Sequence, residues 1–168
     1  MRILARVAVL LLAVVGAATT IRTVAGQAAS PLARAPVTHV GVIVRDVDAT
    51  VRHMEETFGI RIPAPFVSGK TVWNGDPSGP KEWRVKLTSF VLGGVTLELV
   101  EPLDEAGPHR AHLNQFGQGL HHIAFATPDR GAAFAWLTGK GGQQVSPTYV
   151  DMKELLGFTV EVAPTPAR

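Results

Sequence analysis

Two stretches of the chain show the same order of hydrophobic and polar positions. Residues 37–62 can be laid on residues 120–145 at an offset of 83. Each stretch opens with an apolar run that predicts a β-strand. An aspartate follows each run, Asp46 in the first and Asp129 in the second, and a segment with helical periodicity comes next. The correspondence predicts a duplicated unit that begins with a strand and a helix.

The first predicted helix has one apolar face. Val51, Met54 and Phe58 recur at helical spacing, and the positions between them are mostly polar. Gly59 predicts the end of this helix, and the glycines within 139–142 predict the end of its counterpart. We therefore expect each helix to pack one side against a sheet.

The two copies also end alike. Residues 95–102 and 157–164 are rich in β-forming residues and hold a glutamate near the middle and a proline at or next to the end. Before the first of them, the apolar runs on either side of Gly93 and Gly94 predict a β-hairpin. Residues 149–162 have a similar, less regular pattern. Each copy is therefore predicted to be a strand, a helix and a short antiparallel group.

Four residues with metal-ligating side chains occupy corresponding places in the two copies. The histidines, His39 and His122, lie in the first predicted strands, and the glutamates, Glu98 and Glu161, lie in the last ones. A carboxylate inside an apolar strand is costly unless it is paired, hydrogen-bonded or bound to a cation. The recurrence of both residue types in equivalent strands predicts one shared site on a pseudo-twofold axis.

Two imidazoles and two carboxylates form a donor set that suits a divalent cation. The set leaves Co, Ni, Zn, Mn and Fe open, and Mg as well. A single histidine in a strand is more often a hydrogen-bonded core residue than a ligand, and a single glutamate in a strand usually faces solvent. The interpretation in which these residues bind no metal therefore stays open too. The remaining histidines, which are His53, His109, His112 and His121, are assigned no metal role.

The first 28 residues have the pattern of a secretory signal peptide. Arg2 and Arg6 precede an uncharged apolar run, and small residues surround the expected cleavage after Ala28. The alternative is a retained membrane anchor, but the longest uncharged stretch, 7–21, is shorter than the ~20 residues that span a bilayer. We expect an exported protein, periplasmic or secreted, without stable membrane insertion after cleavage.

The predicted leader changes the interpretation of the charge. The whole chain has a formal charge of +2, and removal of residues 1–28 deletes three arginines and no acidic residue, which leaves −1. The basic balance therefore does not favour a nucleic-acid partner. The absence of cysteine excludes disulfides, thiolate metal sites and a cysteine nucleophile.

The rest of the chain is predicted to form one domain. We expect a signal peptide at 1–28, a linker at 29–36 and a domain at 37–164, composed of module one (37–102), a connection (103–119) and module two (120–164). Within module one, residues 63–84 contain Trp73, Trp83 and several glycines and prolines. Two interpretations stay open for this segment: a loop that closes over a pocket, and a surface loop with a tryptophan in the core.

At these residues the chain resembles the vicinal oxygen chelate superfamily, the glyoxalase/bleomycin-resistance-like fold of paired βαβββ modules. The likeness covers about 37–164 and is closest to methylmalonyl-CoA epimerases, through VTHVGVIVRDVD at 37–48 and the stretches 97–103 and 107–125. Its most specific piece is GLHHIA at 119–124. The resemblance implies an α+β fold in which the two modules pair into an open, cupped mixed sheet.

The resemblance places the four metal positions of the family on His39, Glu98, His122 and Glu161 and implies one divalent metal ion. In this superfamily a substrate with two neighbouring oxygens is chelated, and a proton leaves next to a carbonyl to give a metal-stabilised enolate. We therefore expect a metal-dependent isomerase or epimerase in which Glu161 is the catalytic base and Glu98 its partner. The expected partner is a small molecule with vicinal oxygens, and this fold often forms homodimers.

Other functions of the superfamily stay open. Return of the proton to the neighbouring carbon would give a glyoxalase-type lyase on a small 2-oxo adduct. A non-catalytic small-molecule binding module is the alternative outside catalysis, although such members typically lack the four ligands. Export sets the chain apart from cytoplasmic epimerases and glyoxalase I, because neither acyl-CoA nor a glutathione adduct is expected in quantity outside the cytoplasm.

Overall fold

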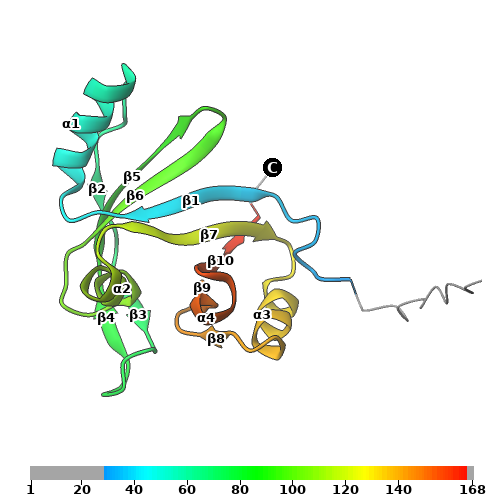
Figure 1. Ribbon diagram of the computed structural model, residues 1–168. Helices are drawn as coiled ribbons and strands as arrows, with labels where there is room; N and C mark the ends of the chain where they lie inside the picture. Colours follow the sequence, from blue (N-terminus) through cyan, green and yellow to red (C-terminus); the bar gives the residue numbers. More distant parts are fainter. Residues whose placement is uncertain (1–28, 166–168) are drawn as a thin grey trace, which may run out of the picture.

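The centre of the structure is a pair of antiparallel strands that come from different copies of the repeat. Strand β1 (Val37–Ile43) pairs with β7 (Gly119–Thr127), and Figure 1 shows the two strands side by side across the middle of the molecule. The computed structural model describes residues 29–165. The signal peptide predicted for 1–28 lies outside the described residues.

Each strand of this pair leads into one module. In the first, β1 is followed by α1 (Val47–Phe58), β2 (Phe66–Val67), β5 (Val85–Leu92) and β6 (Val95–Pro102). In the second, β7 is followed by α3 (Arg130–Gly139), β8 (Gln143–Gln144), β9 (Tyr149–Asp151) and β10 (Thr159–Pro164). The first strand of each module is parallel to its last, β1 to β6 and β7 to β10.

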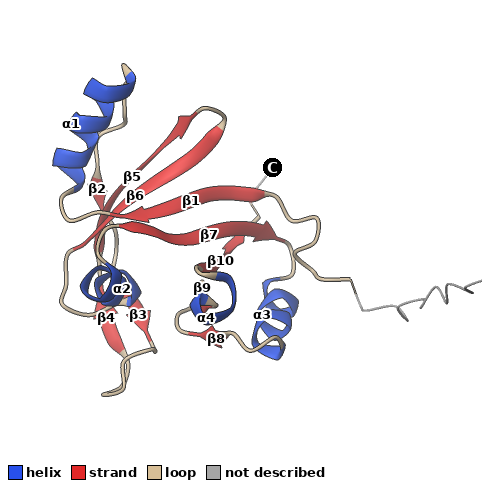
Figure 2. Ribbon diagram, in the orientation of Figure 1, coloured by secondary structure: helices blue, strands red, loops and turns tan. Residues whose placement is uncertain are grey.

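The eight strands form one mixed sheet in the order β2-β5-β6-β1-β7-β10-β9-β8. The order reads the same from either edge when corresponding strands are exchanged, so a pseudo-twofold axis lies between β1 and β7. The predicted α+β class with an open mixed sheet is confirmed, as Figure 2 shows. Helix α2 (Pro108–Phe116) lies in the connection between the modules, and α4 (Lys153–Leu156) lies between β9 and β10.

The two longer predicted helices begin at the predicted aspartates. Oδ1 of Asp46 accepts a hydrogen bond of 2.8 Å from the backbone N–H of Ala49. Oδ1 of Asp129 accepts one of the same length from Ala132. Each carboxylate thereby satisfies a donor that the first turn of a helix leaves free. At the other end of α1, Gly59 adopts the left-handed conformation with φ of 63°.

The predicted hairpin is confirmed. Leu92 of β5 stands opposite Val95 of β6, and the two residues of the turn, Gly93 and Gly94, have φ of 59° and 86°. Both angles lie in the region that suits glycine and that two-residue hairpin turns require. In module two the short helix α4 takes the place of this turn.

Alternate residues of the outer ligand strands pack on opposite sides of the sheet. Leu99 of β6 lies in a core cluster with Val47 and Val51 of α1. Val160 and Val162 of β10 lie in a second cluster with residues of α3. The positions next to them along each strand, which include Glu98 and Glu161, therefore face the side away from these helices.

The predicted apolar face of α1 is partly wrong. Val51 is buried and Met54 packs against the same cluster, but the side chain of Phe58 is 52% exposed. Figure 1 shows the end of α1 extending beyond the strands, so the last turn has no sheet to pack against. Val47, at the start of the helix, takes the buried place instead.

Residues 63–84 form a separate hairpin and an edge strand. Strand β3 (Thr71–Trp73) pairs with β4 (Lys81–Trp83) in a two-stranded sheet, and β2 pairs with β5. Trp83 is 6% exposed and packs in a core cluster with Val100 and Tyr149. The structure therefore favours the interpretation in which a tryptophan of this segment belongs to the core.

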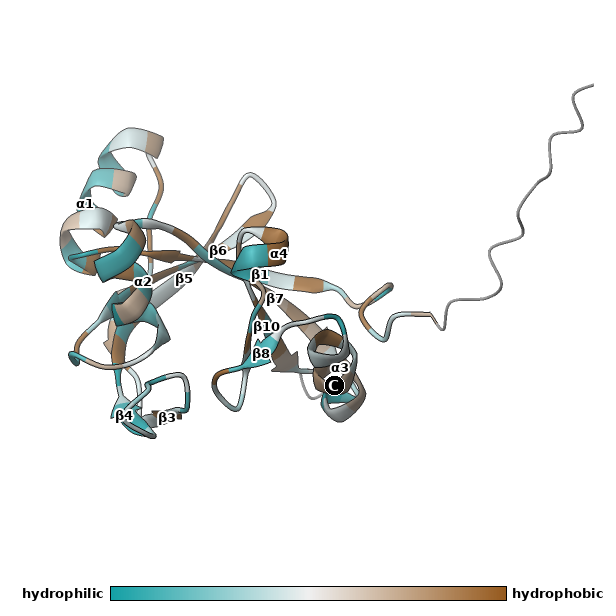
Figure 3. Cartoon of the chain, turned by 60° about the horizontal axis from the view of Figure 1, so that its bottom comes forward, coloured by the Kyte–Doolittle hydropathy of each residue, from teal (hydrophilic) through white to brown (hydrophobic). Residues whose placement is uncertain are grey.

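Hydropathy follows the arrangement of the elements. Figure 3 shows hydrophobic segments along the central strands and hydrophilic ones on β4 and β8. Within residues 29–165, no helix has the length and apolar character needed to cross a membrane.

We expect Asp46→Ala to lower the free energy of unfolding by about 1 kcal/mol, because it removes the acceptor for the N–H of Ala49. Asp46→Asn keeps an acceptor and should cost less. Urea denaturation of the two variants measures the difference. Glu56→Ala is the control, since this side chain is 77% exposed on the same helix. An equal loss in the control would contradict the assignment of the cap.

Candidate metal centre

The four predicted metal ligands lie on four adjacent strands. These are Glu98 on β6, His39 on β1, His122 on β7 and Glu161 on β10. The pairing register also aligns them, because Gly41 of β1 stands opposite Glu98 on one side and His122 on the other. The sheet thus brings together residues that are up to 122 positions apart in the sequence.

The nitrogen and oxygen atoms of these side chains converge. Nε2 of His39 lies 3.2 Å from Nε2 of His122. Oε2 of Glu161 lies 3.1 Å from the first nitrogen and 3.2 Å from the second. Oε2 of Glu98 lies 3.6 Å and 3.5 Å from the same two nitrogens. Ligands bound at about 2.1 Å around a tetrahedral ion stand roughly 3.4 Å apart, so these spacings fit a divalent metal ion.

The electrostatics of the group favour positive charge between the carboxylates. Burial would lower the pKa of His39, but the hydrogen bond to Glu161 and the charges of Glu98 and Glu161 outweigh it, so this pKa is raised. Burial would raise the pKa of the Glu98 carboxyl, but the hydrogen bond with His122 and the nearby histidine charges outweigh it, so this pKa is lowered. Both shifts describe a place that suits a cation.

Thr38 fixes the proton on the ring of His39. Its Oγ1 lies 3.1 Å from Nδ1 of His39 and donates to the carbonyl oxygen of Ala124 at 3.4 Å. Because the hydroxyl proton is used on that carbonyl, Oγ1 accepts from the Nδ1–H of His39. With Nδ1 held by Thr38, Nε2 is the ring nitrogen that faces the carboxylates and would bind a metal ion in place of its proton.

The residue before each histidine is displaced from the regular β1–β7 ladder. The register skips Thr38 in β1 and His121 in β7, which is the pattern of a β-bulge in each strand. A bulge turns a residue out of the strict alternation of side chains. Thr38 contacts Nδ1 of His39 at 3.1 Å, and His121 contacts Nδ1 of His122 at 3.0 Å. The pseudo-twofold relation therefore extends from the ligands to the residues that orient them.

Gly41 makes room for His122. A Cβ atom at this position would stand 2.0 Å from Cε1 of His122, and His122 is fully buried. The sequence does contain a signal for this role, because a glycine inside an apolar strand marks a close approach by another group.

Tyr149 borders the centre from β9, although no sequence pattern singled it out. Its ring centroid lies 5.2 Å from that of His122. Burial, and then the charges of Glu161 and Glu98, raise the pKa of its phenol, which stays protonated and able to donate. A cavity of about 190 Å³ lies beside it and has Glu98, Trp83 and Tyr149 in its lining.

The remaining histidines fall into two groups. His53 is exposed on α1, whereas His109, His112 and His121 are buried. Burial, followed by the charges of neighbouring histidines, holds the pKa of His109 and of His121 well below the usual value. Both imidazoles are therefore neutral.

The paired βαβββ modules and the ligand group on their shared axis define the class of the protein, which is the vicinal oxygen chelate fold. The family model of the glyoxalase/bleomycin resistance protein/dioxygenase superfamily matches residues 38–158, and the chain belongs to this superfamily. The resemblance found in the sequence is thereby confirmed.

Solved structures with this fold include methylmalonyl-CoA epimerases. The enzyme of Streptomyces coelicolor, in complex with 2-nitronate-propionyl-CoA, is 24% identical; the match covers 79% of this chain and 99% of that one, with a TM-score of 0.56. The epimerase of Mycobacterium tuberculosis is 20% identical over 85% and 95% of the two chains, with a TM-score of 0.53. At these identities the likeness shows a common fold.

One curated relative has a higher identity over a shorter stretch. The uncharacterized protein YqjC of Bacillus subtilis is 34% identical over 87 residues, which are 52% of this chain and 54% of that protein. The chain thus spans about half the length of the curated relative that it matches.

We expect Gly41→Ala to destabilise the fold by about 1–3 kcal/mol, because the new methyl group overlaps the buried ring of His122. Gly69→Ala is the matched control, since a Cβ there meets no atom within 4 Å. Thermal and urea denaturation measure both. If the two variants were equally stable, the close approach of His122 to β1 would be contradicted.

Proposed function

We propose that the protein is a metal-dependent isomerase of the epimerase type, which moves a proton on a carbon next to a carbonyl group. The observation that carries the proposal is the convergence of two imidazole nitrogens and two carboxylate oxygens at 3.1–3.6 Å. This donor set suits Co, Ni, Zn, Mn or Fe in the divalent state. The superfamily and the epimerases of the same fold support the reaction class.

The four residues His39, Glu98, His122 and Glu161 would hold the ion. When bound, a divalent ion polarises the carbonyl of the substrate and so acidifies the neighbouring C–H bond. The chain itself supplies the groups that move the proton and exclude water. Tyr149 and Trp83 line the cavity beside Glu98, and the Tyr149 phenol is protonated, since burial and the charges of Glu161 and Glu98 raise its pKa.

Glu161 is the base in this proposal. Its Oε2 faces both histidines, so Oε1 is the oxygen that takes the proton from carbon. Glu98 stands on the other side of the β1–β7 pair and supplies or receives the proton on the opposite face of the planar intermediate. Return on that opposite face inverts the carbon, whereas return to the adjacent carbon gives the glyoxalase-type alternative.

We propose a small substrate with two vicinal oxygens. The Streptomyces coelicolor epimerase structure holds 2-nitronate-propionyl-CoA, and another methylmalonyl-CoA epimerase structure holds methylmalonyl-CoA and NH4+. Export of this chain would separate it from acyl-CoA, so 2-substituted and 2-oxo acids are the compounds to compare with methylmalonyl-CoA. The fold leaves a cavity of about 190 Å³ next to Glu98, which suits a small acyl group.

Glu161→Gln should slow the exchange of solvent deuterium into the substrate by about 10²–10⁴-fold, because the amide cannot take the proton. The assay follows deuterium by mass spectrometry, after loading with each divalent metal, for methylmalonyl-CoA and for the acids named above. Glu56→Gln, on the exposed face of α1, is the control and should exchange at the wild-type rate. Exchange by Glu161→Gln at that rate would overturn the proposed base. A wild-type chain that binds metal and substrate without exchange would favour the non-catalytic binding module.

We further propose that the protein is exported through residues 1–28. Expression of the full chain in a bacterial host should yield a periplasmic or secreted product whose intact mass begins at Ala29. Leu11→Arg combined with Leu12→Arg interrupts the apolar run and should leave an unprocessed precursor in the cytoplasm. A wild-type product that keeps its first 28 residues would contradict cleavage.

A further inference from the structure

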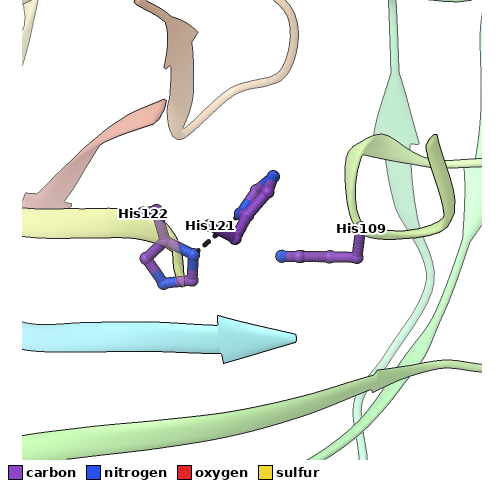
Figure 4. A group of neighbouring side chains, drawn as sticks. All are labelled: His109, His121 and His122. Carbon is purple, nitrogen blue, oxygen red and sulfur yellow. Dashed lines mark hydrogen bonds between the residues drawn. The ribbon is translucent and has the colours of Figure 1, made fainter. Parts of the chain in front are cut away.

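A second group of buried nitrogen atoms lies on the other side of His122. His109 of α2 and the neighbours His121 and His122 of β7 each offer a ring nitrogen, and these nitrogens lie within 4.8 Å of one another. All three side chains are buried, at 2%, 0% and 0% exposure. Figure 4 shows His109 extending from its helix with a ring nitrogen directed at the other two rings.

The bulge in β7 creates this group. In a regular strand His121 and His122 would face opposite sides of the sheet. Because the ladder skips His121, its Nδ1 stands 3.0 Å from Nδ1 of His122. Its ring also contacts that of His109, with 4.7 Å between the centroids. Bulges that redirect a side chain in this way are common beside functional sites.

The group has more buried polar atoms than partners. Within residues 29–165, six buried side-chain nitrogen and oxygen atoms have no hydrogen-bond partner, and five of them belong to Trp83, His109, His112 and His121. Both ring nitrogens of His109 are among them. Native interiors leave few such atoms unsatisfied. The unpartnered nitrogens of His109 can bind a cation, whereas the donor-only N–H of Trp83 cannot, and His112 lies outside the three-histidine group.

We propose that His109, His121 and His122 bind a second metal ion. His122 faces the first centre through Nε2 and this group through Nδ1, so its ring bridges the two ions. The bridge rests on the proposed function, whereas the three-histidine site itself does not. Binding both ions requires the ring proton of His122 to leave to solvent.

The donor set selects the kind of ion. Three imidazoles without a carboxylate suit zinc or copper and do not suit Mg²⁺ or Ca²⁺, which prefer oxygen ligands. Trp83 and Tyr149 pack against His109, with ring centroids at 4.7 Å and 5.4 Å. The ion would therefore sit among aromatic rings, and His109, Trp83 and Tyr149 share the lining of one cavity with Glu98.

Zinc stoichiometry tests the proposal. The purified full chain is treated with a chelator, titrated with Zn²⁺ and dialysed, and the bound zinc is measured by mass spectrometry. We expect two zinc ions per wild-type chain and one in His109→Leu, with His109→Gln as a second variant if the first fails to fold. Glu98→Gln combined with Glu161→Gln should also retain one. His53→Leu, whose side chain is 80% exposed, is the control and should retain two.

A titration with Cu²⁺ distinguishes the two candidate metals at the same site. Two copper ions in the wild type and one in His109→Leu support the proposal with copper as the ion. Titration with Co²⁺ adds a spectroscopic measurement, because its visible absorption depends on the ligand set. We expect two absorption components in the wild type and loss of one in His109→Leu.

The outcomes separate the two proposed centres. One zinc or copper ion in the wild type and in His109→Leu would overturn the second site and leave the first centre intact. One ion that is lost in His109→Leu and kept in the double glutamate variant would support the three-histidine site and overturn the first centre. No bound ion with any of these metals would overturn both.

Discussion

The antiparallel pairing of β1 with β7 is the constraint on which the rest of the structure depends. It is the one junction between the two modules in the main sheet, and it sets His39 beside His122. The parallel neighbours β6 and β10 then bring one glutamate to each side. A slip of one residue in this pairing would turn a histidine toward the helices, so the hydrophobic clusters under α1 and α3 also hold the ligands in register.

The ligand group is stable only as a whole. A partly buried carboxylate is costly without a partner, and each glutamate here stands within 3.6 Å of two imidazoles. Truncating one member would leave the others with uncompensated charge, which is more costly than replacing the set by apolar residues. The two partly buried carboxylates thus favour a cation between them.

Much of this centre could be predicted from the sequence, because the offset of 83 residues aligned both pairs of ligand-type residues and strand geometry then placed them on one face. The features that could not be predicted are those in which the structure departs from the regular periodicity of a helix or strand. The periodicity of α1 included Phe58 in the buried face, since a pattern carries no information on where the sheet ends. The bulge at His121 arises from tertiary packing and leaves no periodic signature in the sequence.

The paired bulges allow the two halves of the duplicated fold to differ next to the candidate metal centre. The skipped position in each strand orients the ligand that follows it without taking part in the ladder, so its identity can differ between the halves while the register stays the same. It is a hydroxyl in one half and an imidazole in the other. The two histidines of an otherwise symmetric centre thereby have different groups at Nδ1. A fold built by repetition in this way acquires two halves that differ next to the centre while the sheet keeps its pseudo-twofold order.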